Sequence, residues 1–235
     1  MYYGYYGYYF DPTYFLILIA IAISGIASMR MKSTFLKYTR VSSRLGLTGA
    51  ETAKRILESQ GIYDVQVVHV AGELTDHYDP RTRTVNLSDP VYASTSIAAV
   101  GVAAHECGHA VQDAVGYVPL QVRGAIVPVV NIGSSLSWPM ILIGVFLSQG
   151  RLISLGIVLF SFSVIFQLVT LPVEFNASHR ALRLLESTGI LIRDEVNDTR
   201  KVLTAAALTY VAATIGSLLQ LLRLLILFGG RRRDD

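Results

Sequence analysis

Residues 125–171 have the sequence AIVPVVNIGSSLSWPMILIGVFLSQGRLISLGIVLFSFSVIFQLVTL, in which Arg151 is the one charged side chain. Segments 125–147 and 152–171 each approach or exceed the roughly 20 apolar residues that a helix needs to cross a bilayer. The short link between them leaves room only for a tight turn. We therefore predict a transmembrane helical hairpin over residues 125–171.

Two further apolar segments lie on either side of this hairpin in the chain. Residues 13–29 contain no charge and lack the basic start and small-residue cleavage site of a signal peptide, so we expect a retained membrane helix. Residues 202–228 carry Gln220 and Arg223 in their later half. Because a charge deep in the bilayer is costly, we expect that end of the segment to lie at the membrane–water interface or to face other parts of the protein.

The composition agrees with a membrane protein. Hydrophobic residues make up 52% of the chain and charged residues only 16%, below the roughly 25% of soluble proteins. A lone cysteine excludes an intrachain disulfide framework, and no basic run with interleaved aromatic residues indicates a nucleic-acid surface. We expect a mainly α-helical integral membrane protein with about four transmembrane or membrane-embedded helices.

Residues 30–120 have ordinary polarity and contain helix and strand patterns. Thr48 and Glu51 form a capping-box pattern before a short helix. Alternating residues over 65–70 and 82–87 predict two strands, the second following a turn, so that a small hairpin lies beside the next helix. These patterns predict a small α+β zincin-like catalytic region.

The chain is thus expected to have five consecutive regions. They are an aromatic N-terminus with the first membrane helix (1–29), a catalytic segment (30–120), the transmembrane hairpin (125–171), an amphipathic helix starting at Pro172 (172–201), and a fourth membrane helix with a basic C-terminus (202–235).

A His-Glu-x-x-His motif lies in a helix predicted over 94–115 or 96–115. His105 and His109 are four residues apart, so their imidazoles share one helix face and are able to bind a single Zn²⁺ ion. Glu106 is placed to act as general base on a zinc-activated water that attacks a peptide carbonyl. The alternative, two surface or satisfied core histidines, is disfavoured because the small apolar residues before the motif indicate a buried helix, where polar groups need partners.

A catalytic zinc site needs a third protein ligand and one open position. Gln112 and Val115 stand where metzincins have glycine and histidine, so that class is excluded. The third and fourth apolar segments contain no aspartate, which excludes the pattern of site-2 proteases. A glutamate on a later helix is therefore expected to complete the site.

Glu174 is the best candidate for this third ligand, and Glu186 and Glu195 are the alternatives. It follows the returning arm of the hairpin, so an even number of crossings places it on the same side as His105. The other interpretation is that Glu174 is an ordinary carboxylate at the membrane–water interface and pairs with Arg180 or Arg183. We favour the ligand, because an unpaired acidic group so close to hydrocarbon is costly.

Other polar residues near the motif have more open roles. Ser178, one turn beyond Glu174, is placed to orient a ligand, and His179 is a candidate for polarising the substrate carbonyl. His69 and His77 fall near the predicted strands, where a structural or surface role is favoured. Cys107 is expected to point away from the metal as a small buried residue.

The segments VAAHECGHAVQ (102–112) and LPVEFNAS (171–178) resemble the YugP-like family of bacterial neutral zinc metallopeptidases. More distantly, the motif helix followed by Glu174 is similar to the HtpX and CAAX prenyl protease families. Those families use such a glutamate as a zinc ligand, which supports Glu174, but they carry aspartate where this chain has Ser178. The resemblance implies a zinc-dependent membrane endopeptidase of the gluzincin type.

The expected partners are the lipid bilayer and a polypeptide substrate at or near the membrane, with no nucleic acid. A zinc-binding membrane scaffold or pseudoprotease is the alternative function, and a transporter with a chance motif is disfavoured because the spans carry few charges.

The expected location is the bacterial plasma membrane. Basic residues after the first span, including Arg30 and Lys32, place the catalytic face in the cytoplasm, whereas Arg231 to Arg233 conflict with four full crossings.

Overall fold

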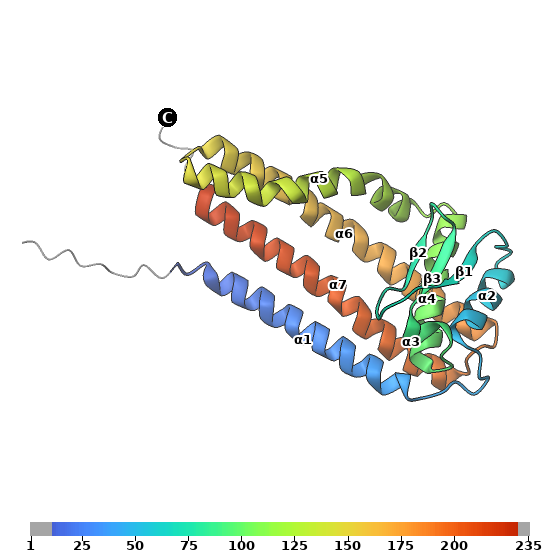
Figure 1. The fold of residues 1–235 in the computed structure, drawn as a ribbon. Coiled ribbons are helices and arrows are strands. Elements are labelled where there is room, and N and C mark those ends of the chain that lie inside the picture. The colour runs from blue at the N-terminus through green and yellow to red at the C-terminus, as the bar shows by residue number, and fades with distance from the viewer. Residues whose placement is uncertain (1–10, 230–235) are drawn as a thin grey trace, which may run out of the picture.

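The computed structural model describes residues 11–229, so the tyrosine-rich N-terminus and the arginines at 231–233 lie outside the described residues. Long helices extend from a compact region of short helices and strands (Figure 1). In chain order the elements are α1 (Tyr14–Thr39), α2 (Gly49–Ser59), β1 (Gln66–His69), β2 (His77–Asp79), β3 (Thr84–Leu87), α3 (Asp89–Tyr92), α4 (Ile97–Ala114), α5 (Val118–Phe146), α6 (Gly150–Ser187) and α7 (Arg193–Phe228).

Within residues 11–229, the four helices α1, α5, α6 and α7 are long and apolar enough to cross a membrane. Their most apolar windows have mean hydropathies of 1.6 to 2.4, and no more than 22% of any window is buried inside the protein. A helix that is apolar around most of its surface and yet unburied requires an apolar solvent. The four predicted membrane helices are thus confirmed by length and composition.

The helix start expected at Pro172 does not occur. Helix α6 continues through Pro172 to Ser187, so the segment expected as a separate amphipathic helix consists of the end of α6, a turn and the start of α7. A proline inside a helix loses one backbone hydrogen bond, a loss that neighbouring groups often compensate in membrane helices. The consequence is that one continuous helix connects the hairpin to the region holding Glu174.

The two predicted strands are present as β1 and β3, but they pair in parallel, and the hairpin is formed by β3 with β2, a strand that was not predicted from the sequence. The order of this three-stranded sheet is β1-β3-β2, with β1 parallel to β3 and β2 antiparallel to β3. The capping box of Thr48 and Glu51 begins α2 as expected, and Ser96 caps α4 by accepting from the Ala99 amide. Helices α2 and α4, the sheet and the adjoining ends of α6 and α7 share one hydrophobic core.

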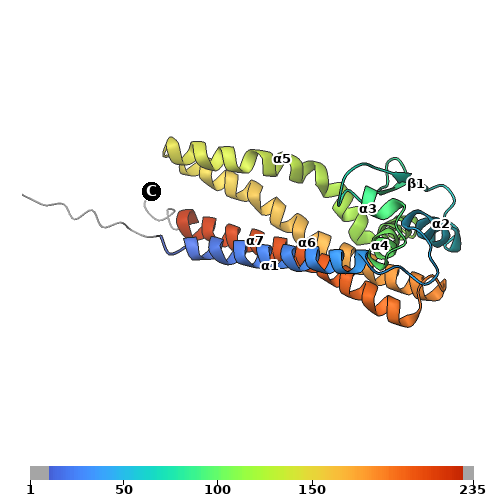
Figure 2. The same ribbon diagram turned by 60° about the horizontal axis from the view of Figure 1, so that its bottom comes forward.

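The long helices form two pairs that meet at the compact region of short helices and strands. Helix α5 packs along α6, and α1 packs along α7 (Figure 2). Helix α4 packs against both α6 and α7, at the end of the bundle where α1 terminates. The motif helix is therefore held where the two membrane pairs converge.

Candidate metal centre

Helix α4 approaches its neighbours closely because its buried face is made of small residues. A Cβ atom on Gly101 would lie 2.7 Å from a side-chain carbon of Thr199, and one on Gly108 would lie 2.6 Å from the carbonyl oxygen of Ala177. Both are shorter than any ordinary contact, so only glycine fits at these positions without a shift. This packing brings the motif on α4 against the part of α6 that carries Glu174.

His105, His109 and Glu174 form one buried cluster. Their candidate ligand atoms all lie within 4.8 Å of one another. The Nε2 atoms of His105 and His109 lie 3.2 and 3.6 Å from the same oxygen, Oε2 of Glu174. The Glu174 side chain is only 6% exposed. The structure therefore brings together the three residues expected to bind the metal, from α4 and α6.

The outer nitrogen of each imidazole contacts a polar side chain. His109 Nδ1 lies 3.0 Å from Gln112 Oε1, while Gln112 Nε2 donates to the carbonyl of Val173 and thereby fixes the orientation of the amide. An amide oxygen only accepts, so Nδ1 of His109 carries the proton and Nε2 presents its lone pair to the cluster. Ser178 Oγ lies 3.1 Å from His105 Nδ1, at the position expected for a residue that orients a ligand.

The second oxygen of Glu174 has a partner that the sequence did not indicate. Arg123 on α5 donates from Nη1 to Glu174 Oε1 over 2.9 Å. Arg180, one of the two partners considered from the sequence, instead donates to Asn176. Because Arg123 lies 51 residues before Glu174, only the packing of the α5–α6 hairpin brings them together.

Glu106 projects beside the cluster and is itself buried. Burial raises the pKa of its carboxyl group to about 7, because removal from water disfavours the charged form. A carboxylate that exchanges its proton near neutral pH is suited to general base and acid chemistry.

Two cavities meet at this cluster. The smaller, of about 170 Å³, lies against α1 and α7 and has mainly apolar walls that include Phe35 and Leu203. The larger, of about 460 Å³, faces β2 and the start of α5 and has more polar walls that include Arg123. His105, Glu106, Glu174 and Tyr210 line both cavities. A chain that passes from one cavity to the other would therefore run past the histidines and the glutamates.

Tyr210 and Gln112 are functional candidates that sequence reasoning did not identify. Tyr210 on α7 interacts with Glu174 and faces both cavities. Gln112 had a local signal, since it lies three residues after His109 on the same helix. Tyr210 had none, because its position depends on how α7 packs against α4 and α6.

The remaining sequence candidates lie apart from the cluster. His179 is exposed on α6 and lines neither cavity. His69 contacts Asp89, in agreement with a structural role. His77 contacts Asn86 and also lines the larger of the two cavities. Cys107 is buried and points toward the carbonyl of Ala53, as expected for a residue that faces away from the metal.

The alternative glutamates also have other environments. Glu195 accepts from the backbone amides of Ile192, at the start of α7, and of Arg44. Glu186 is exposed near the end of α6. Glu174 is thus the one of the three that reaches the two histidines.

The donor set fits zinc. Two imidazole nitrogens and one carboxylate oxygen are the protein ligands of many catalytic zinc sites, which keep a further position open for water or substrate. Both imidazoles direct Nε2 inward, and contacts to their Nδ1 atoms hold the rings, which is the usual arrangement around zinc-binding histidines.

Comparisons with known proteins agree with this chemistry. A family described as "Putative neutral zinc metallopeptidase" matches residues 13–229. The chain is 51% identical over 221 residues to "Putative membrane protease YugP" of Bacillus subtilis (strain 168), across 94% of this chain and 98% of that protein. No solved structure matches the chain significantly.

Proposed function

Because the chain belongs to this neutral zinc metallopeptidase family, we propose that it is a membrane-embedded zinc endopeptidase that hydrolyses peptide bonds. His105, His109 and Glu174 would hold the zinc ion, and Glu106 would act as general base. The observation that carries the proposal is the convergence of both Nε2 atoms on one oxygen of Glu174, with Glu106 adjacent.

A zinc ion held there supplies Lewis acidity, which acidifies water and polarises a carbonyl group. The residues of the chain perform the proton transfers. Glu106 accepts a proton from the attacking water, whose oxygen bonds to the carbonyl carbon of the scissile peptide. Glu106 then gives that proton to the departing amide nitrogen as the C–N bond breaks.

Two further side chains are placed to stabilise negative charge on the carbonyl oxygen. Tyr210 carries a hydroxyl donor at the junction of both cavities, and Arg123 lines the polar one. Donors fixed in place before the reaction stabilise an oxyanion more than water does, because they need no reorganisation. Arg123 also keeps the Glu174 carboxylate oriented toward the histidines.

The substrate is proposed to be a polypeptide in or next to the bacterial plasma membrane. The relative from Bacillus subtilis is named a membrane protease, and four helices of this chain are candidate spans. The cluster lies at the same end of the bundle as the basic C-terminal part of α1, which includes Arg30 and Lys37. By the positive-inside rule, this supports a cytoplasmic catalytic face.

The test compares Glu106→Gln with the wild-type protein on an unfolded soluble polypeptide. We expect the variant to keep its zinc and to lose cleavage by at least about 10²-fold, the usual contribution of a general base. Glu186→Gln removes an exposed glutamate outside the cluster and should cleave like the wild type. Equal activity of Glu106→Gln would refute the assignment, and wild-type protein that holds zinc but cleaves no polypeptide would favour the scaffold alternative.

A further inference from the structure

The apolar cavity at the metal centre has the size of one large side chain. Its volume is about 170 Å³, and a dry cavity of about 150 Å³ in a protein interior is large enough for benzene. Val102, one helical turn before His105 on the same face of α4, belongs to the wall together with His105 and Glu106. The rest of the wall is mainly apolar and comes from α1 and α7: Met31, Phe35, Val202, Leu203, Ala206 and Ala207. A side chain in this cavity would therefore belong to a residue next to the metal centre.

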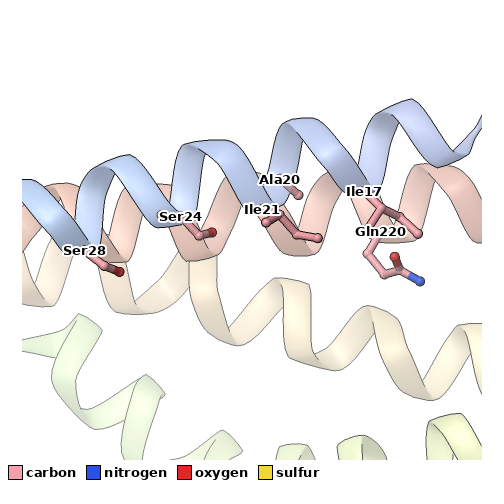
Figure 3. Close-up of a pocket in the computed structure, with 7 residues that line it drawn as sticks. Ile17, Ala20, Ile21, Ser24, Ser28 and Gln220 are labelled. Atoms are coloured by element: carbon pink, nitrogen blue, oxygen red, sulfur yellow. The ribbon is translucent and has the colours of Figure 1, made fainter.

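The cavity lies beyond the membrane part of α1. Figure 3 shows that part beside α7, with residues up to Ser28. Arg30 and Lys32, both exposed, follow it and mark the membrane surface, because charged side chains are costly in hydrocarbon. Met31 and Phe35, the α1 residues of the cavity, thus lie at or past this surface. This position favours the side chain of a polypeptide over a lipid chain as the occupant.

Leu74, in the loop between β1 and β2, bounds the open side of the cavity. It is 62% exposed, whereas the other described residues that line the cavity are buried or half-buried. Its φ of 58° lies in the left-handed region, which costs free energy for any residue with a Cβ and which glycine adopts readily. Neither the exposure nor the backbone conformation therefore favours leucine for the stability of the loop.

Hydrogen bonds on both sides of Leu74 fasten this loop to the start of α3. The Gly72 amide donates to Asp89 Oδ2 over 2.8 Å, and the Asp76 carboxylate accepts from the amide and the hydroxyl of Ser88. A strained residue persists when its surroundings hold it, and such residues cluster at ligand sites. The loop thus keeps an apolar side chain beside the cavity although the fold does not require one there.

We propose that the apolar cavity takes one large aliphatic or aromatic side chain of the substrate, next to the scissile bond, and that Leu74 closes over this side chain and selects for it. The proposal rests on the proposed peptidase function and adds to it the residue type that the enzyme prefers at the cleavage site. Binding there removes apolar surface of the substrate, of Leu74 and of Phe35 from water, which is favourable.

The test begins with the sites at which the full-length protein, loaded with zinc in lipid vesicles, cleaves an unfolded soluble polypeptide. Mass spectrometry of the products should show a large apolar residue, such as leucine or phenylalanine, on one fixed side of most cleaved bonds. Two soluble peptides are then compared that differ only by leucine or alanine at that position. We expect kcat/KM to be at least about tenfold higher for the leucine peptide, a discrimination that an apolar pocket can supply.

Two substitutions should remove this preference. Ala206→Leu fills the cavity from α7, so kcat/KM for the leucine peptide should fall about tenfold while the alanine peptide is cleaved nearly as before. Leu74→Gly opens the cavity, so the preference should fall roughly fivefold as part of the apolar contact is lost. Thr204→Leu, at an exposed position of α7 that lines neither cavity, is the control and should keep the wild-type preference.

Thermal unfolding separates selection from a structural role of Leu74. Because glycine adopts the left-handed conformation without penalty, Leu74→Gly should unfold at or above the temperature of the wild type while its preference falls. A purely structural leucine would do the opposite: the unfolding temperature would fall and the preference would stay, which would overturn the proposal.

The peptidase function and the pocket fail in different ways. A wild type that cleaves without preference for large apolar residues, or Ala206→Leu and Leu74→Gly variants that keep the preference, would overturn the proposal and leave the peptidase function standing. Absence of cleavage of every polypeptide would overturn the peptidase function and the proposal with it.

Photo-crosslinking locates the substrate side chain without cleavage. A photoreactive residue at position 74 of the Glu106→Gln variant should crosslink to the leucine peptide, and the alanine peptide should compete only at about tenfold higher concentration. The same photoreactive residue at position 73, which is exposed and lines neither cavity, should crosslink far less. Equal yields from positions 73 and 74, or crosslinks from position 74 to lipid alone, would overturn the proposal.

Discussion

Replacing Gly108 with alanine should push α4 and α6 apart at the metal centre. The new Cβ would lie 2.6 Å from the carbonyl oxygen of Ala177, and ordinary contact begins at 3.4 Å. The two helices must therefore separate by roughly 0.8 Å, a strain of the kind that costs about 1–3 kcal/mol in a packed core. Ala177 lies between Glu174 and Ser178, so the separation moves both away from the histidines.

The displacement acts on short contacts. His105 Nε2 and Glu174 Oε2 are 3.2 Å apart, and Ser178 Oγ is 3.1 Å from His105 Nδ1. A misplacement near 1 Å in a catalytic site can lower the rate by about 10²-fold, and we expect a loss of this order together with weaker zinc binding.

The assays are cleavage of the soluble polypeptide, competition for zinc with a chelator, and thermal unfolding. Gly150→Ala is the matched control, because a Cβ at that helical glycine meets no atom within 4 Å. It should behave as the wild type in all three assays. If Gly108→Ala binds zinc and cleaves as well as Gly150→Ala, the contact between α4 and α6 does not position the cluster and the reasoning is refuted.

Three further substitutions test the groups around the cluster. Gln112→Leu removes the acceptor for His109 and the donor to Val173, so zinc affinity should fall roughly 10- to 100-fold in chelator competition, and unchanged affinity would contradict this role. Arg123→Gln should lower the unfolding temperature of the zinc-free protein more than that of the zinc-loaded protein, because a bound zinc ion would still compensate the buried charge of Glu174. An equal loss in both forms would contradict the pairing of Arg123 with Glu174. Tyr210→Phe should lower kcat by about 10²-fold at unchanged zinc content, and full activity would remove Tyr210 from the proposed mechanism.

The clustering of His105, His109 and Glu174 was predictable from the sequence because its geometry is largely local. His105 and His109 are one helical turn apart. Glu174 directly follows an apolar hairpin that is long enough to cross the membrane twice, so the chain returns to the side of the membrane that holds His105. The membrane helices were predictable for a similar reason, since the length and low polarity of each segment are sufficient to identify it as a candidate span. Ser178 was identified because it lies one turn from Glu174 on the same helix.

The groups that depend on tertiary packing were not predictable. Arg123 reaches Glu174 only through the crossing of α5 and α6, and Tyr210 only through the packing of α7. Proline is a general signal for a helix start, but at Pro172 the helix continues, because membrane helices tolerate an unpaired carbonyl when neighbouring groups compensate it. The orientation of Gln112 likewise depends on a contact with Val173 across two helices.

The central claim is that His105, His109 and Glu174 together hold a zinc ion beside Glu106. It is tested most directly by the zinc content of purified wild-type protein, Glu106→Gln and Glu174→Ala, determined by elemental analysis after dialysis. We predict stoichiometric zinc in the wild type and in Glu106→Gln, and loss of zinc in Glu174→Ala. Zinc retained at the wild-type level by Glu174→Ala, or absent from the wild type, would contradict the account.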